Sequence, residues 1–94
     1  INYYPTEEAG NSNSKWRPVG LGLMGLQDVF FKLRLPFDSD EARELSTRIS
    51  EEIYFHALTA SNELAAQHGP HGGWDESRAA KGQLQFDLWG VTPS

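Results

Sequence analysis

The sequence predicts a mainly α-helical chain with two helices, the second about 30 residues long, followed by a short helical turn and an extended C-terminal segment. Two stretches, 17–35 and 38–69, repeat apolar residues at helical spacing, whereas 83–89 alternates apolar and polar residues. Residues 1–16 are polar and rich in turn formers, which predicts an extended lead-in. We expect one partial domain over 1–94, divided into 1–16, 17–35, 38–69 and 70–94.

The first predicted helix is too apolar to stand alone. Its main face repeats at steps of three and four residues, and Pro36 ends the pattern. Further apolar side chains spread around most of its circumference, so it needs burial on several sides. One partner helix cannot cover it, and we expect contacts with other protein. The main face holds Val19, Leu23, Leu26, Phe30 and Leu33, and the additional side chains are Leu21, Met24, Val29, Phe31 and Leu35.

The second predicted helix has clear start and stop signals. Asp38 is the expected N-cap, with Glu41 closing a capping box, and Gly69-Pro70 supplies the stop. At 1.5 Å per residue the helix is roughly 45 Å long, too long for a compact body of 94 residues. We therefore expect it to lie on a larger structure. Its stripe is narrow and consists of Ala42, Leu45, Ile49, Ile53, Ala57, Ala60 and Leu64.

The C-terminal quarter is predicted to be mostly irregular. A loop over 71–74 leads to one helical turn over 75–82. Leu84, Phe86 and Leu88 alternate with polar residues, which predicts a short strand or extended segment. A single strand has no partner here, so its backbone groups would need a sheet from elsewhere.

Composition excludes several classes of function. The 94 residues contain no cysteine, which excludes a disulfide framework, a thiolate metal site and a nucleophilic thiol in this chain. The net charge of −5 is concentrated in 38–63, where an acidic face would repel phosphate, so we expect no nucleic-acid partner. Apolar runs are far shorter than the roughly 20 residues that span a bilayer, so we expect a soluble chain with no membrane partner. We also expect a cytoplasmic location. Without an initial Met or a leader, the chain is expected to be an excerpt of a longer protein.

The stretch from Gly20 through Gly22 to Gly25 matches the G-x-G-x-x-G pattern of dinucleotide-binding folds. That motif needs a buried strand before it, and residues 14–18 do not predict one. The simpler interpretation is that the glycines allow close packing.

Histidines and tryptophans suggest structural roles rather than chemistry. His68 and His71 flank a Gly-Pro turn, and with Asp75 they lack a fourth metal ligand. His56 has no nucleophile arrangement beside it, and we expect it to pack. Trp74 and Trp89 are expected to anchor the chain against neighbouring protein. We assign no catalytic, cofactor-binding or metal-binding residue here.

From Arg17 to Asp28 the sequence resembles the large (α) subunit of class I ribonucleotide reductases. The similarity is ordered from end to end of the chain and includes the stretches 2–5, 8–9, 36–39, 53–54, 57–58, 60–61, 64–65, 80–82 and 87–89. The resemblance implies a piece of a ten-stranded α/β barrel in an oxidoreductase that converts ribonucleoside diphosphates to deoxyribonucleoside diphosphates for DNA synthesis. It implies no site residue here, because the family's functional cysteines and tyrosines lie outside this stretch.

The same resemblance implies partners and cofactors for the parent enzyme. The partners are the rest of the large subunit, a second large subunit and a small (β) subunit. ATP and deoxynucleoside triphosphates act as effectors, and a metal-containing small subunit supplies a radical. The chain alone is expected to be an inactive scaffold. Two other interpretations stay open: a free-standing helical protein-interaction module, and a dinucleotide-binding fragment at Gly20, Gly22 and Gly25.

Overall fold

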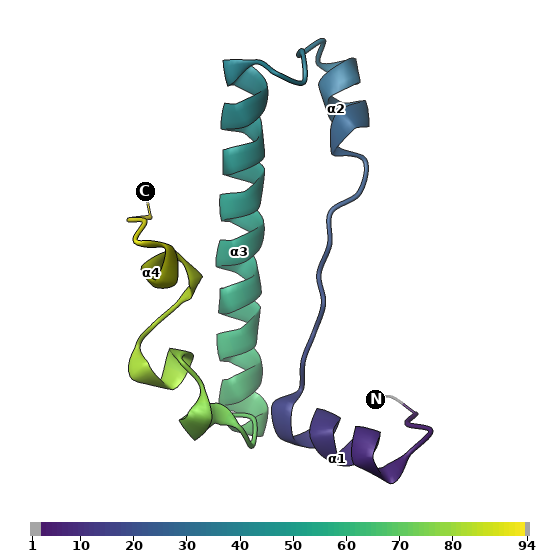
Figure 1. The fold of residues 1–94 in the computed structure, drawn as a ribbon, viewed down its shortest axis with the longest axis vertical. Helices are drawn as coiled ribbons and strands as arrows, with labels where there is room; N and C mark the ends of the chain where they lie inside the picture. Colours follow the sequence, from purple (N-terminus) through teal and green to yellow (C-terminus); the bar gives the residue numbers. More distant parts are fainter. Residues whose placement is uncertain (1–2, 94) are drawn as a thin grey trace. The chain divides into compact units, whose positions relative to one another are not determined.

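The computed structural model describes residues 3–93 and is helical, with no strand among them (Figure 1). Four α-helices, α1 to α4, lie among these residues, and two 3₁₀ turns come between α3 and α4. The described chain divides into two compact units, 3–19 with 68–93, and 20–67. No helix among the described residues is long and apolar enough to cross a bilayer.

Helix α1, Glu7–Trp16, occupies most of the range 1–16 in which an extended lead-in is predicted, so that prediction is wrong over the helical residues. Residues 1–2 of the predicted range lie outside the described residues. Thr6 caps it by accepting a hydrogen bond at Oγ1 from the Ala9 N–H at 3.2 Å, and two glutamates in the first turn interact favourably with the helix dipole. The Asn13 amide donates to the Tyr4 hydroxyl just before the start of the helix. No residue of α1 is buried. A helix without a buried face needs no apolar periodicity, and the periodicity that predicts most helices is missing from this sequence.

Helix α2 covers only Leu26–Lys32 of the helix predicted over 17–35. Residues 17–25 carry no regular secondary structure. Gly25 adopts φ +83°, outside the helical region, and each glycine inside a helix costs about 1 kcal/mol relative to alanine. The pattern of apolar side chains is present, but the backbone cost of three glycines confines the helix to the residues after Gly25.

The end of α2 is a Schellman turn. The Leu35 N–H donates to the Phe30 carbonyl at 2.9 Å and the Arg34 N–H donates to the Phe31 carbonyl at 3.1 Å. This geometry places Arg34 in the left-handed region, at φ +56°. The chain therefore reverses before Pro36 without a glycine.

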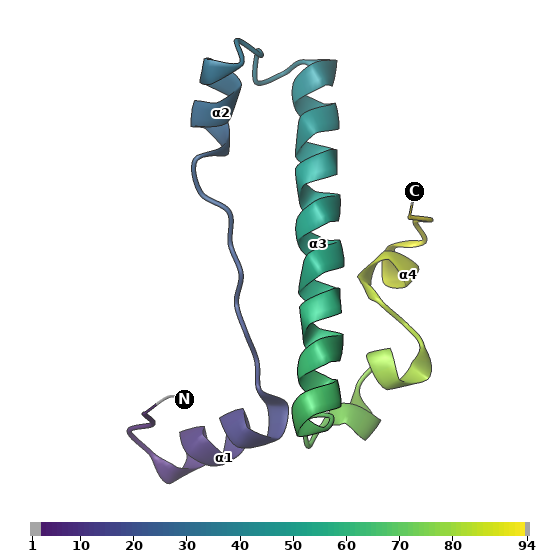
Figure 2. The ribbon, with the colours of Figure 1, turned by 180° about the vertical axis from the view of Figure 1, so that it is seen from behind.

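Helix α3 spans Asp40–His68, against the predicted range of 38–69. Its cap is Ser39, whose Oγ accepts from the Ala42 N–H at 3.1 Å, so the prediction of Asp38 as N-cap is wrong by one residue. Asp38 pairs instead with Arg43, at 2.8 Å. Glycine at 69 adopts φ +79° and ends the helix. Figure 2 shows α3 from behind as one long, uninterrupted helix.

The corner between α2 and α3 holds the buried apolar side chains of the described residues. Phe30 is 3% exposed and Ala42 1% exposed, and the Phe30 ring meets Phe37 edge-on with centroids 6.4 Å apart. Most of α3 beyond this corner is open to solvent. The unit 20–67 therefore buries far less apolar surface than its sequence contains.

The C-terminal quarter is helical where the sequence predicts an extended segment. Two 3₁₀ turns, η1 at Trp74–Glu76 and η2 at Ala79–Lys81, occupy the predicted single helical turn. Helix α4, Gln85–Trp89, contradicts the strand predicted over 83–89. The Asp87 carboxylate accepts from the Leu84 N–H at 2.9 Å, and Gly90 closes the helix at φ +68°. These local hydrogen bonds favour a helix. The alternation of apolar and polar residues over 83–89 does not distinguish a strand from a helix in so short a run.

Candidate functional site

Two structural features of the described residues are candidates for a functional site. One is a set of contacts between the end of α1 and the loop over 70–76, here called the α1 clasp. The other is an apolar hollow on α3. Each lies within a single unit of the structure.

The α1 clasp is built from the last residues of α1 and the first residues after α3. The Gly73 N–H donates to the Lys15 carbonyl at 3.0 Å, and the Arg17 guanidinium donates to the Pro70 carbonyl at 3.1 Å. Lys15 also pairs with Glu76 at 3.2 Å. Both charged groups of that pair are about half exposed or more, so the pair adds little stability. The two hydrogen bonds to backbone carbonyls fix the geometry.

Aromatic rings fill the clasp. The His71 ring lies 6.3 Å from the Trp16 ring and 6.1 Å from the Trp74 ring, measured between centroids. Lys15 Nζ lies 4.8 Å from the Trp16 ring centroid, within the range of a cation–π contact. Gly73 is buried against Trp16, and a Cβ added there would come within 2.2 Å of a ring carbon. Only glycine fits at this position.

The clasp changes the interpretation of two predicted positions, His71 and Trp74. His71 and Trp74 pack within this chain, with each other and, through His71, with Trp16. The described residues contain no group of three His, Cys, Asp or Glu side chains arranged to hold a metal ion. His68, His71 and Asp75 are thus not brought together as ligands. Trp89, by contrast, is 71% exposed on α4.

Sequence reasoning missed the α1 side of the clasp. Lys15, Trp16 and Arg17 lie in a polar stretch without apolar periodicity, and their partners are more than 50 residues away. The one local signal was the Gly72-Gly73 pair beside an aromatic residue, which is typical of a close approach between backbone and ring.

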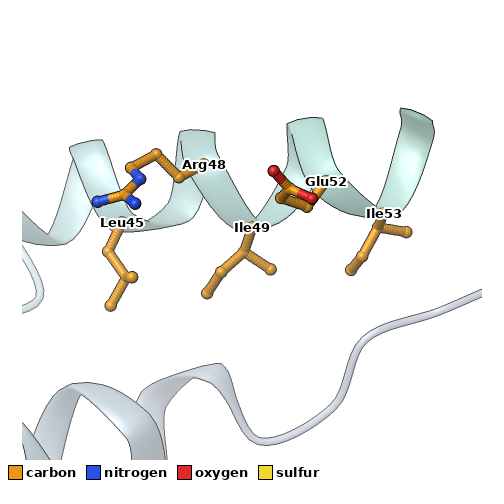
Figure 3. Close-up of a pocket in the computed structure, with 5 residues that line it drawn as sticks. All are labelled: Leu45, Arg48, Ile49, Glu52 and Ile53. Carbon is orange, nitrogen blue, oxygen red and sulfur yellow. The ribbon is translucent and has the colours of Figure 1, made fainter. Parts of the chain in front are cut away.

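The apolar hollow on α3 has a volume of about 380 Å³. Leu45, Ile49 and Ile53 project from the same side of the helix, one turn apart, and Arg48 and Glu52 flank them (Figure 3). These three aliphatic residues belong to the stripe predicted from the sequence. The lining contains no nucleophile and no group of convergent polar side chains, so this hollow suits packing rather than chemistry.

His56 and the neighbouring Glu52 lie on the surface of α3. His56 Nε2 lies 3.3 Å from a Glu52 carboxylate oxygen, one turn apart, and both side chains are more than two-thirds exposed. The His56 ring also meets Phe55 edge-on, at 5.4 Å between centroids. Such a pair is an ordinary contact on a solvated helix face.

The glycine motif is extended rather than folded into a phosphate-binding turn. Of its three glycines only Gly25 has positive φ, and a Cβ added at Gly20 or Gly22 would meet no atom within 4 Å among the described residues. In a dinucleotide-binding fold the first glycine makes the tight turn between strand and helix. That turn is absent from the described residues at 20–25, and the geometry does not favour nucleotide binding there.

The chain belongs to the family described as ribonucleotide reductase, barrel domain, whose family model matches residues 1–94. It is 57% identical over 94 residues to the ribonucleoside-diphosphate reductase large subunit of Caenorhabditis elegans, covering 100% of this chain and 12% of that protein. It is 56% identical over 93 residues to the large subunit of Dictyostelium discoideum, covering 99% of this chain and 11% of that protein. The large subunit of Danio rerio is 50% identical over 94 residues, covering 100% of this chain and 12% of that protein.

Proposed function

We propose that this chain is part of the large subunit of a ribonucleoside-diphosphate reductase, an oxidoreductase that converts ribonucleoside diphosphates to deoxyribonucleoside diphosphates for DNA synthesis. The observation that carries the proposal is identity of 50–57% along the whole chain to proteins with that name. The chain spans 11–12% of the length of these relatives, so most of the proposed enzyme lies in sequence outside it.

Within that enzyme the chain acts as scaffold and holds none of the reacting groups. It lacks cysteine, and the family resemblance requires cysteines for radical and redox chemistry. The hollow on α3 and the α1 clasp are lined by packing residues. The role of this chain is to position other parts of the large subunit.

The partners follow from the same proposal. The apolar side chains of Leu21, Met24 and Phe31 are 69–90% exposed in this chain. Exposing apolar surface to water costs free energy, and the rest of the large subunit would remove that cost by covering these side chains. A second large subunit, a metal-containing small subunit and nucleoside-triphosphate effectors would bind elsewhere in the enzyme, in the cytoplasm. No group of three His, Cys, Asp or Glu side chains among the described residues is arranged to hold a metal ion, and we assign no step of the reaction to this chain.

The test is the activity of the full-length protein that carries this chain. Purified with the small subunit from the same source, it should convert a ribonucleoside diphosphate to the deoxy product, measured by chromatography of the nucleotides. A folded full-length protein that binds its small subunit but yields no deoxynucleotide from any of the four diphosphates would overturn the proposal.

A further inference from the structure

The α1 clasp joins two parts of the chain that are far apart in the sequence. The Arg17 guanidinium donates to the Pro70 carbonyl across 53 sequence positions. Both residues lie in the unit formed by residues 3–19 and 68–93. The chain leaves this unit after residue 19 and returns to it at residue 68. The clasp therefore lies within a few residues of both points at which the chain crosses between the units.

The unit between these crossing points contributes little to its own stability. Among residues 20–67 only Phe30 and Ala42 are buried. Residues 17–25, through which the chain enters the unit, carry no regular secondary structure. A long segment loses much conformational entropy when it becomes ordered, and joining its ends removes part of that cost in advance. Contacts that join the ends therefore stabilise this unit without being part of it.

Arg17 adopts a backbone conformation that is unusual for arginine. It follows α1 with φ 45° and ψ 52°, in the left-handed region, where glycine has no steric cost. Its N–H donates to the Asn13 carbonyl at 2.7 Å, and its guanidinium donates to the Pro70 carbonyl at 3.1 Å. Glycine would relieve the backbone strain at this position but has no side chain that reaches Pro70. The strain is thus offset by a contact that requires a long side chain with a donor.

We propose that the α1 clasp is a closing device for residues 20–67, which holds together the points at which the chain enters and leaves them. Arg17 contributes to both sides of this device. Its backbone turns the chain out of α1, and its side chain holds the loop by which the chain returns. Closing the ends reduces the entropy that residues 20–67 lose when the rest of the large subunit covers their apolar side chains. That covering belongs to the proposed function, whereas the clasp itself does not depend on the reaction.

Hydrogen exchange in the folded full-length protein tests the closing role. Arg17→Met keeps a long side chain and the backbone strain but removes every side-chain donor, so the contact with Pro70 is lost. Amides throughout α3 should then exchange at least about threefold faster, by a common factor. Asp87→Ala is the control, because it removes a cap of α4 in the same unit but outside the clasp, and it should leave α3 unchanged. Faster exchange confined to the residues around 17 and 70 would overturn the proposal.

An engineered disulfide provides the converse test, in which the clasp is closed covalently. A Cβ added at Gly72 would lie 3.5 Å from both the Cα and the Cγ of Lys15, which brings it within disulfide reach of the Lys15 Cβ. Oxidation of the Lys15→Cys/Gly72→Cys variant should therefore form the cross-link, which mass spectrometry of its peptides identifies. The oxidised protein should exchange at least about threefold more slowly throughout α3 than the reduced form. Unsubstituted protein taken through the same oxidation controls for other effects of the oxidant.

The outcomes separate the closing device from the proposed function. A cross-link that does not form, or that slows exchange only around residues 15 and 72, would overturn the device. A protein with reductase activity whose α3 exchange is the same with the clasp intact, broken or cross-linked would keep the function and lose the device. A protein that responds to the clasp as expected but reduces no ribonucleoside diphosphate would keep the device and lose the function.

Discussion

At the scale of single residues, backbone geometry constrains the choice of amino acid more than side-chain chemistry does in this chain. Gly25, Gly69, Gly82 and Gly90 all adopt positive φ at helix boundaries, where glycine has no steric cost. Gly73 is constrained differently, by the Trp16 ring that occupies the space a side chain would need. These positions tolerate little change, even though none of them carries a reactive group.

Gly73→Ala should destabilise the α1 clasp by about 1–3 kcal/mol, because the new methyl group must displace Trp16 or break the hydrogen bond to the Lys15 carbonyl. Urea unfolding of the full-length protein measures the change. Gly72→Ala is the matched control, since its Cβ would lie no closer than 3.4 Å to any neighbour. Equal effects from the two substitutions would show that the contact with Trp16 does not constrain position 73.

At the scale of elements, hydrogen bonds at the ends set where helices begin and stop. Thr6, Ser39 and Asp87 each accept a backbone N–H at a helix start, and the turn through Arg34 closes α2. Periodicity predicted α3 within a few residues but misjudged α2, whose apolar pattern continues through glycines that the helix does not include. Element ends therefore follow caps and backbone cost rather than hydrophobic spacing.

Ser39→Ala should cost about 0.5–2 kcal/mol of stability, because the Ala42 N–H loses its acceptor at the first turn of α3. The sequence-predicted cap provides the control. Asp38→Ala should cost less, since it removes only an exposed pair with Arg43. Chemical denaturation of the full-length protein compares the two, and a larger loss from Asp38→Ala would restore Asp38 as the effective cap.

At the scale of the whole molecule, the chain exposes more apolar surface than its own core can use. Among the described residues only Phe30 and Ala42 are buried apolar side chains, whereas Met24, Val19, Leu21 and Phe31 are each at least 69% exposed. Large apolar side chains left exposed in this way are typical of surfaces that other protein covers. The 94 residues are best understood as part of a larger packed structure.

The isolated chain should therefore associate with itself or remain loosely packed, because covering one such side chain contributes roughly 1.5–3 kcal/mol. Sedimentation velocity over a range of concentrations measures the association. A triple substitution to serine at Leu21, Met24 and Phe31 should shift the distribution toward monomer. A well-folded monomer at high concentration, unchanged by that substitution, would contradict the expectation.

The scaffold role predicts that the ionisable side chains on the surface of α3 are not needed for catalysis. His56→Ala, Glu51→Gln and Glu52→Gln should each leave the kcat of the full-length reductase within a few-fold, since a general acid or base contributes roughly 10²–10⁴-fold. Initial rates with a saturating diphosphate substrate test this. A hundredfold loss from any one substitution, with helicity unchanged by circular dichroism, would place α3 in the active site.

Sequence alone determined the long helix α3, its apolar stripe, the surplus of apolar side chains and the family, because these depend on local periodicity and on residue identity along the whole chain. It did not determine α1, the true length of α2 or the helical turn of α4. Those depend on caps, on glycine backbone conformations and, for the clasp, on contacts such as Arg17 with Pro70. Tertiary structure decides such contacts because they join residues more than 50 positions apart, whose proximity no local pattern records.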